Sequence, residues 1–173
     1  DTGDLLLTRS VEIRADDNFV ALHDRLAEVG ADLLVETFDQ LATGLLTPTP
    51  QNEAEATTAR KLRDEDLTID WSRSSQDLFN QIRALDPWPG ARAVLDEKPI
   101  KIWAARIAAH DFDLETAPPG TIGEVGKGEQ GIPVKTGDGV LLINELQFSG
   151  KKRLTAQQFL AGKTILPGTR FTF

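Results

Sequence analysis

Five short β-prone runs, separated by charged or glycine-rich turns, occupy residues 91–148 and most constrain what this chain can fold into. Such spacing is typical of sandwiches and small barrels, because each turn reverses the chain before a long element can form. We therefore predict a mainly-β domain closed into a small barrel. The expected strands are 91–95, 100–107, 121–125, 132–136 and 140–148.

Two short helices are expected to flank these strands. Ser74 and Asp77 resemble a capping box, and apolar residues at 78, 82 and 85 form one helical face that Pro87 ends. Thr155 can cap a last helix that contains Phe159.

Residues 1–45 follow another pattern. The partly alternating stretch 5–13 predicts a strand, and Asp16, Asp17 and Asn18 offer an N-cap to a helix with apolar residues every three or four positions. Gly30 is expected to kink or divide this helix, and Gly44 to end it. One strand and one helix bury too little apolar surface to fold alone, so we interpret this segment as the tail of an α/β layer.

The predicted domain boundary is the linker 46–62, where Pro48 and Pro50 alternate with threonine and favour extended backbone. The second domain is then 63–173. The net charge of −8 lies mainly in residues 1–45, which carry ten acidic and three basic residues. Because phosphate contacts favour basic surfaces, nucleic-acid binding would depend on local patches in the remainder.

The absence of cysteine excludes disulfides and thiolate metal sites, and no apolar run reaches the length of a membrane span. The chain also lacks methionine. We therefore expect that Asp1 is not the natural start and that the chain is a fragment or a processed product.

Several short motifs occur in a specific order along nearly the whole chain. They are Asp1-Thr2-Gly3-Asp4, Ile69-Asp70-Trp71-Ser72, Asp86-Pro87-Trp88-Pro89-Gly90, Thr136-Gly137-Asp138-Gly139, Gly150-Lys151-Lys152-Arg153 and Pro167-Gly168-Thr169-Arg170. In this order the chain resembles the methionyl-tRNA formyltransferase family, from its aspartate loop through its C-terminal domain.

The resemblance implies transfer of a formyl group from 10-formyltetrahydrofolate to the amino group of methionyl initiator tRNA, a step of translation initiation. It implies the tail of a Rossmann-like formyltransferase domain (1–45), followed by a linker and an OB-like β-barrel that binds tRNA. Asp1 matches the family's catalytic aspartate, whereas the catalytic asparagine and histidine would lie upstream, so this chain alone is expected to be inactive. We further expect a cytoplasmic monomer, bacterial or organellar, without a metal.

Two basic clusters are candidates for phosphate contacts with tRNA. The first is Lys151, Lys152 and Arg153 between a predicted strand and a helix cap, and the second is Arg60, Lys61 and Arg63 at the linker. Such clusters are commonly solvated loops, and the family resemblance is what favours tRNA contact.

Other features favour ordinary structural roles. His23 is expected on the helix flank, and His110 lies in an acidic loop with no second histidine near it, which argues against a metal site. Gly126–Gly131 has the GxGxxG spacing, but a strand rather than a helix is expected to follow, so we interpret it as a hairpin turn. We expect the three tryptophans to pack rather than to stack on bases.

Two alternative functions remain open from the sequence. Formyltransferases that act on amino-sugar nucleotides share the Asp-Thr-Gly loop and the Pro-Trp-Pro-Gly turn, although segment 150–160 fits the tRNA enzyme better. A non-catalytic RNA-binding module could share the barrel, but it would have no need of the α/β tail.

Overall fold

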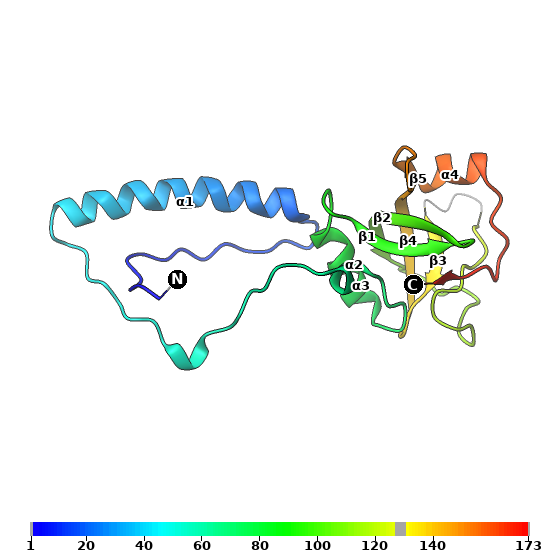
Figure 1. Ribbon diagram of the computed structural model, residues 1–173, viewed down its shortest axis with the longest axis horizontal. Helices are drawn as coiled ribbons and strands as arrows, with labels where there is room; N and C mark the ends of the chain where they lie inside the picture. The colour runs from blue at the N-terminus through cyan, green and yellow to red at the C-terminus, as the bar shows by residue number, and fades with distance from the viewer. Residues whose placement is uncertain (1, 127–130, 173) are drawn as a thin grey trace. The chain divides into compact units, whose positions relative to one another are not determined.

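The computed structural model describes residues 2–126 and 131–172 and divides into two compact units, Asp1–Lys61 and Leu62–Phe173 (Figure 1). Each unit has its own secondary structure. The functional roles expected for 1–45, 46–62 and 63–173 are not decided by this division and stay predictions.

The first unit is built on one long helix, α1 (Phe19–Ala42), with a short 3₁₀ helix, η1 (Glu53–Glu55), further along the chain. The Asn18 side chain caps α1 by accepting a hydrogen bond from a backbone N–H of the first turn. At the other end, Gly44 has φ +67°, which allows the chain to turn so that Leu45 N donates to Gln40 O at 3.0 Å. The predicted helix and its caps are confirmed.

Two expectations for this unit are wrong. The stretch 5–13 is extended but forms only an isolated bridge between Leu5 and Thr49, because no second strand among the described residues lies along it. A Rossmann-like layer is therefore not shown. Gly30 does not divide α1, which continues through it, since one glycine costs a helix only about 1 kcal/mol relative to alanine.

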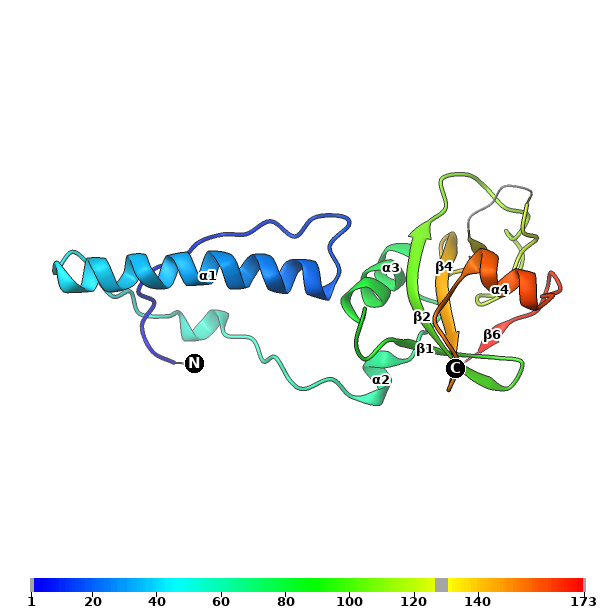
Figure 2. The same cartoon turned by 90° about the horizontal axis from the view of Figure 1, so that it is seen from above.

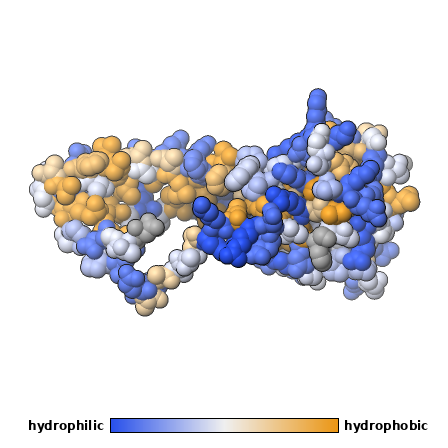
Figure 3. All heavy atoms as spheres, in the orientation of Figure 1, coloured by the Kyte–Doolittle hydropathy of each residue, from blue (hydrophilic) through white to orange (hydrophobic). Residues whose placement is uncertain are grey.

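α1 has no buried residue. Figure 3 shows apolar side chains gathered over this part of the chain, and the most exposed on α1 include Leu34, Val35 and Phe38, each more than half exposed. A globular unit rarely leaves so many large apolar side chains of one helix in water. Within the described ranges, no helix combines the length and apolar character needed to span a membrane.

The second unit is a curled antiparallel sheet. Its strand order is β3-β4-β2-β1-β6, and β5 pairs with β4 off this path. The strands are β1 (Ala91–Leu95), β2 (Lys98–Ile107), β3 (Ile132–Lys135), β4 (Val140–Phe148), β5 (Leu154–Thr155) and β6 (Phe171–Thr172). The predicted strands 91–95 and 140–148 match the observed bounds, and 100–107 and 132–136 match within two residues.

The predicted strand 121–125 is wrong as a continuous element. Only Thr121 and Ile122 form bridges, one to Arg170 and one to Val134. Ile122 N also donates to Thr169 O, and Lys135 N donates to Thr121 O, both at 2.8 Å. This short segment therefore links the β3 edge of the sheet to the chain that leads into β6.

Three helices border the sheet: α2 (Asp64–Leu67), α3 (Ser75–Ala84) and α4 (Ala156–Gly162). α3 packs against β2, and α4 lies beside β4 and β5 (Figure 2). Thr155 and Gln158 form a complete capping box at α4, whereas at α3 the Ser74 side chain accepts from Asp77 N.

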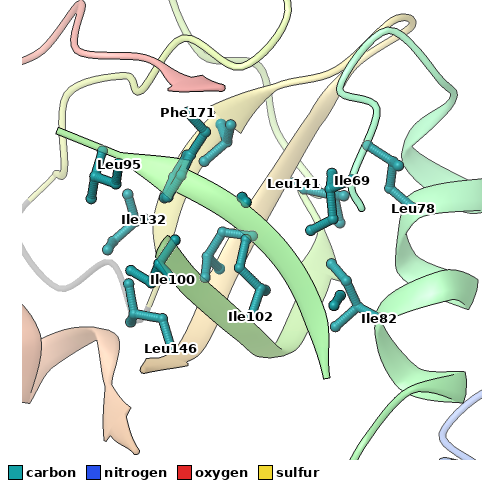
Figure 4. Packing of buried hydrophobic residues seen from close by; sticks show 14 of the residues in the cluster. Ile69, Leu78, Ile82, Leu95, Ile100, Ile102, Ile132, Leu141, Leu146 and Phe171 are labelled. Atoms are coloured by element: carbon teal, nitrogen blue, oxygen red, sulfur yellow. The ribbon is translucent and has the colours of Figure 1, made fainter. Parts of the chain in front are cut away.

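The core lies between the curled sheet and these helices. Leu78 and Ile82 of α3 face Ile102 and Leu141 of the sheet (Figure 4). Period-two alternation places Ile100 and Ile102 inward, so the residues between and after them point outward. That outward face carries the candidate site.

Candidate nucleic-acid interface

A row of polar side chains crosses the outer face of the sheet. Arg92 on β1 pairs in register with Lys101 on β2, which pairs with Gln147 on β4. Lys101 and Gln147 are half-buried, and Arg92 is exposed and bonded to Asp64 at 2.8 Å. The alternation of the isoleucines in β2 is the sequence signal that would have placed Lys101 on this face.

The turn 86–90 packs onto the same face. Lys101 Nζ donates to Pro89 O at 2.7 Å, and Gly90, with φ +87°, lies directly on the Trp103 ring. A Cβ atom at Gly90 would come 2.7 Å from that ring, so only glycine permits this approach. The turn therefore buries Trp103, although Trp103 points out of the sheet.

Packing was expected for all three tryptophans, and it is confirmed for two. Trp71 is 2% exposed and stacks on Phe171 with ring centroids 5.3 Å apart, and Trp103 is 8% exposed. Trp88 is 76% exposed, so the packing prediction is wrong there. The flanking prolines fix the turn, but they do not bring the Trp88 ring onto the sheet.

Arg153 ties the segment 150–153 to this turn. Its guanidinium bonds Asp86 Oδ1 at 2.6 Å and the Glu145 carboxylate, and it lies 5.3 Å from the Trp103 ring centroid. Burial alone would lower the pKa of Arg153, but the hydrogen bonds to Glu145 and Asp86 raise it above its ordinary value. Arg153 is thus held by the protein itself.

Lys151 and Lys152 lie beside this anchored arginine and are exposed. Gln147 fixes their backbone, because its Nε2 donates to Lys151 O at 2.6 Å while its Oε1 accepts from Trp103 Nε1 at 3.0 Å. In the part of the chain that the structure describes, neither lysine forms an ion pair. Their ammonium groups are available to a ligand.

We call this face, together with the turn 86–90 and the segment 151–153 that are anchored to it, the basic–aromatic surface. Its members are Trp88, Lys101, Trp103, Lys151, Lys152 and Arg153.

The other predicted site residues lie elsewhere. Arg60 and Lys61 belong to the first unit and are exposed, with Arg60 Nη1 donating to Lys61 O at 3.1 Å. Arg63 belongs to the second unit and lies 3.6 Å from Glu65. This cluster is therefore divided between the two units. Asp1, the predicted catalytic residue, lies outside the described residues.

Two hollows, of about 560 and 800 Å³, lie beside the loop that contains His110. Asp111 lines both, with Glu115, Asp138 and Lys135 in the first and with Asp113 and Glu124 in the second. The second hollow therefore disfavours an anionic ligand, because carboxylates repel phosphates and the carboxylates of a folate.

Three sequence features remain to be placed: a possible metal site, His23 and the GxGxxG segment. Over residues 2–126 and 131–172 no cluster of three metal-ligating side chains occurs. His23 is exposed beside Asp24, as expected for a helix flank. Of the GxGxxG segment, residues 127–130 lie outside the described residues.

Sequence comparison finds relatives over nearly the whole chain. It is 46% identical to a methionyl-tRNA formyltransferase of Citrifermentans bemidjiense, over 97% of this chain and 51% of that protein. It is 43% identical to one of Desulforamulus reducens, over 100% of this chain and 53% of that protein. The chain therefore spans about half the length of the curated relatives it matches.

Structure comparison finds HypX from Aquifex aeolicus, including a complex with tetrahydrofolic acid. That complex has a TM-score of 0.65 at 19% identity, covering 92% of this chain and 27% of HypX. At this identity the likeness concerns the fold alone. The family model for the formyl transferase C-terminal domain matches residues 61–164. The chain therefore belongs to the formyl transferase C-terminal domain family.

Proposed function

We propose that this chain is the tRNA-holding part of a methionyl-tRNA formyltransferase. The complete enzyme would transfer a formyl group from 10-formyltetrahydrofolate to the amino group of methionyl initiator tRNA. Relatives that are 43–46% identical over nearly the whole chain carry that name. The observation that carries the role of this part is the exposed Lys151–Lys152 pair, held on a fixed framework.

The electrostatics of this pair support phosphate contact. The carboxylates of Asp86 and Glu145 on this surface are both bonded to Arg153 rather than to the lysines. An exposed lysine pair with no internal partner can replace the counterions of two phosphates at little cost. Arg60, Lys61 and Arg63 stay proposed contacts at the linker.

The proposed architecture has three parts. Segment 1–45 is the tail of a Rossmann-like catalytic domain, 46–62 is a linker, and 63–173 is an OB-like tRNA-binding barrel. The apolar side chains that α1 leaves exposed support the first assignment, because a tail needs the rest of its domain to cover them. The curled antiparallel sheet with its bridging segment 120–123 supports the last.

The catalytic role of Asp1 rests on the resemblance of its loop. In the complete enzyme we assign this carboxylate to orienting and stabilising a protonated imidazole, while the upstream asparagine and histidine stabilise the developing oxyanion. We assign no described residue to the folate. A cytoplasmic location and a monomeric state likewise stay predictions.

The salt dependence of tRNA binding tests the role of the surface. Replacing both lysines (Lys151→Ala with Lys152→Ala) should weaken tRNA binding by this chain and reduce the slope of log K against log salt by about 0.7–0.9 per lost phosphate contact. A matched control, Arg73→Ala with Arg170→Ala, removes two positive charges outside the basic–aromatic surface and should leave the slope nearly unchanged. Equal slopes for the two double variants would contradict the assignment.

The substrate is tested on the complete enzyme. We expect formylation of methionyl initiator tRNA and none of an amino-sugar nucleotide, with turnover severely reduced by Asp1→Asn. Preference for the sugar nucleotide would establish the alternative enzyme, and tRNA binding without formylation would establish a binding module.

A further inference from the structure

Trp88 is an exposed aromatic side chain on a fixed support. Of the three tryptophans, all of them described, Trp71 and Trp103 are 2% and 8% exposed, whereas Trp88 is 76% exposed. An isolated exposed apolar side chain needs no explanation by itself. Trp88 differs from such an isolated side chain because the turn that carries it is held rigidly.

Both sides of that turn are anchored. Before Trp88, Asp86 bonds Arg153 at 2.6 Å. After Trp88, Pro89 O accepts from Lys101 Nζ at 2.7 Å, and Gly90 packs on Trp103. The indole of Trp88 is therefore presented by a rigid turn, so little conformational entropy is lost when a ligand packs on it.

The surroundings of Trp88 favour an anionic occupant. The Asp86–Arg153 bond places the segment that carries Lys151 and Lys152 next to the turn. The single positive charge of Arg153 offsets one of the two carboxylates that it bonds, and the charges of Lys151 and Lys152 outweigh the other, so these five residues keep one net positive charge. Phosphate-binding cations beside an open aromatic face are the combination that single-stranded nucleic acid requires.

We propose that Trp88 stacks on an unpaired base of an RNA whose backbone lies along Lys151 and Lys152. This inference deepens the proposed function and rests on it, since it requires that the basic–aromatic surface bind RNA. Bases within an A-form duplex stack on one another and offer no free face, so the occupant is a single-stranded segment. Stacking on an indole tolerates any base, so this contact adds affinity and discriminates single strand from duplex.

The chain carries its own probe of this contact. Because Trp71 and Trp103 are buried, acrylamide quenching reports mainly on Trp88. Saturation with a hexa-adenylate ribonucleotide should quench Trp88 fluorescence and shield it from acrylamide. A blunt RNA duplex with the same number of phosphates should do neither.

Variants measure the contribution of stacking. Trp88→Ala should weaken hexa-adenylate binding by about 5- to 150-fold, the range expected for one stacked base, and should change duplex binding less than twofold. Trp88→Phe keeps a ring and should recover most of the lost affinity. Leu166→Ala, which removes another exposed apolar side chain (69% exposed), is the matched control and should bind as the unaltered chain does.

Two results would overturn the stacking contact. In the first, Trp88→Ala binds hexa-adenylate as tightly as the unaltered chain, or loses equal affinity for the duplex. In the second, Trp88→Ala destabilises the complete enzyme without affecting RNA, which would make Trp88 a contact to protein. If tRNA binding still depends on Lys151 and Lys152, the proposed function survives either result. If the unaltered chain binds no RNA at all, both the proposed function and the stacking contact are wrong.

Discussion

Replacing Arg153 with alanine should destabilise the second unit, although Arg153 belongs to a basic cluster that the sequence predicts to contact RNA. Its guanidinium bonds two carboxylates whose side chains are 14% (Asp86) and 34% (Glu145) exposed. An exposed ion pair contributes about 0.2–1 kcal/mol, and breaking a buried one costs about 3–5 kcal/mol. Since these groups lie between those limits, we expect about 1 kcal/mol for each.

The Trp103 ring adds to this cost. Arg153 lies 5.3 Å from the ring centroid, and a cation in that position contributes about 0.5–1 kcal/mol. The total expected loss for Arg153→Ala is about 2–3 kcal/mol, a large fraction of the 5–15 kcal/mol typical of a domain. Arg153→Lys should recover only part of it, because an ammonium group cannot bond both carboxylates with the fork geometry of a guanidinium.

Urea unfolding followed by tryptophan fluorescence measures this loss. All three tryptophans lie in Leu62–Phe173, so the signal reports the unit that contains Arg153. The Lys151→Ala, Lys152→Ala double variant is the control, and it should change the free energy of unfolding by less than about 0.5 kcal/mol, as surface substitutions do. If Arg153→Ala is as stable as this control, the guanidinium does not hold the turn, and the reasoning from its contacts fails.

Two further substitutions test the junction between α3 and the sheet. The backbone N–H of Ser75 donates to the Asp138 carboxylate at 2.7 Å, and this bond holds the pKa of Asp138 below its ordinary value. The ionised carboxylate therefore stabilises the fold above about pH 4, and this contribution is lost as the pH falls. Asp138→Asn should therefore lower the free energy of unfolding by about 0.3–1 kcal/mol at pH 7, with the deficit shrinking as the pH falls below about 4; a deficit independent of pH would contradict the role of the charge. Gly137→Ala would place a Cβ atom 2.0 Å from Ser72 O, a backbone atom that cannot swing aside, so we expect a loss of at least about 1–3 kcal/mol in urea unfolding. Gly126→Ala, whose Cβ atom would meet no atom of the described residues within 4 Å, should be nearly neutral, and equal stability of the two alanine variants would contradict the reasoning.

The elements that the sequence predicted well are those specified by neighbouring residues. β-prone runs bounded by turns predicted the strands 91–95 and 140–148, and capping residues at 16–18, 74 and 155 predicted three helix starts, because both signals act within a few residues. The stretch 5–13 failed because a β-prone run becomes a strand only beside a partner, which its own residues do not reveal. Segment 121–125 failed for the same reason, since its hydrogen bonds go to two different parts of the chain.

The candidate site shows the same limit. Lys151 and Lys152 were predicted to be exposed, and they are. No local pattern indicates that Arg153 bonds Asp86, a residue 67 positions earlier. The exposure of Trp88 was missed because the adjacent prolines indicate a rigid turn but carry no information on what the turn packs against.

The residues of the motifs that resemble the family fall into two groups, those whose side chain or backbone is held by internal contacts and those that are exposed. In the Pro-Trp-Pro-Gly turn, Gly90 is fixed by its approach to Trp103, and in the Gly-Lys-Lys-Arg segment Arg153 is fixed by two carboxylates. The side chains that these same motifs leave unengaged are Trp88, Lys151 and Lys152. Residues with internal contacts stabilise the fold whether or not a ligand is bound, whereas exposed residues on a rigid support add little to the free energy of unfolding. Recognition by this chain should therefore depend on the exposed members of each motif and stability on the fixed ones, so substitutions within one motif should separate the two properties.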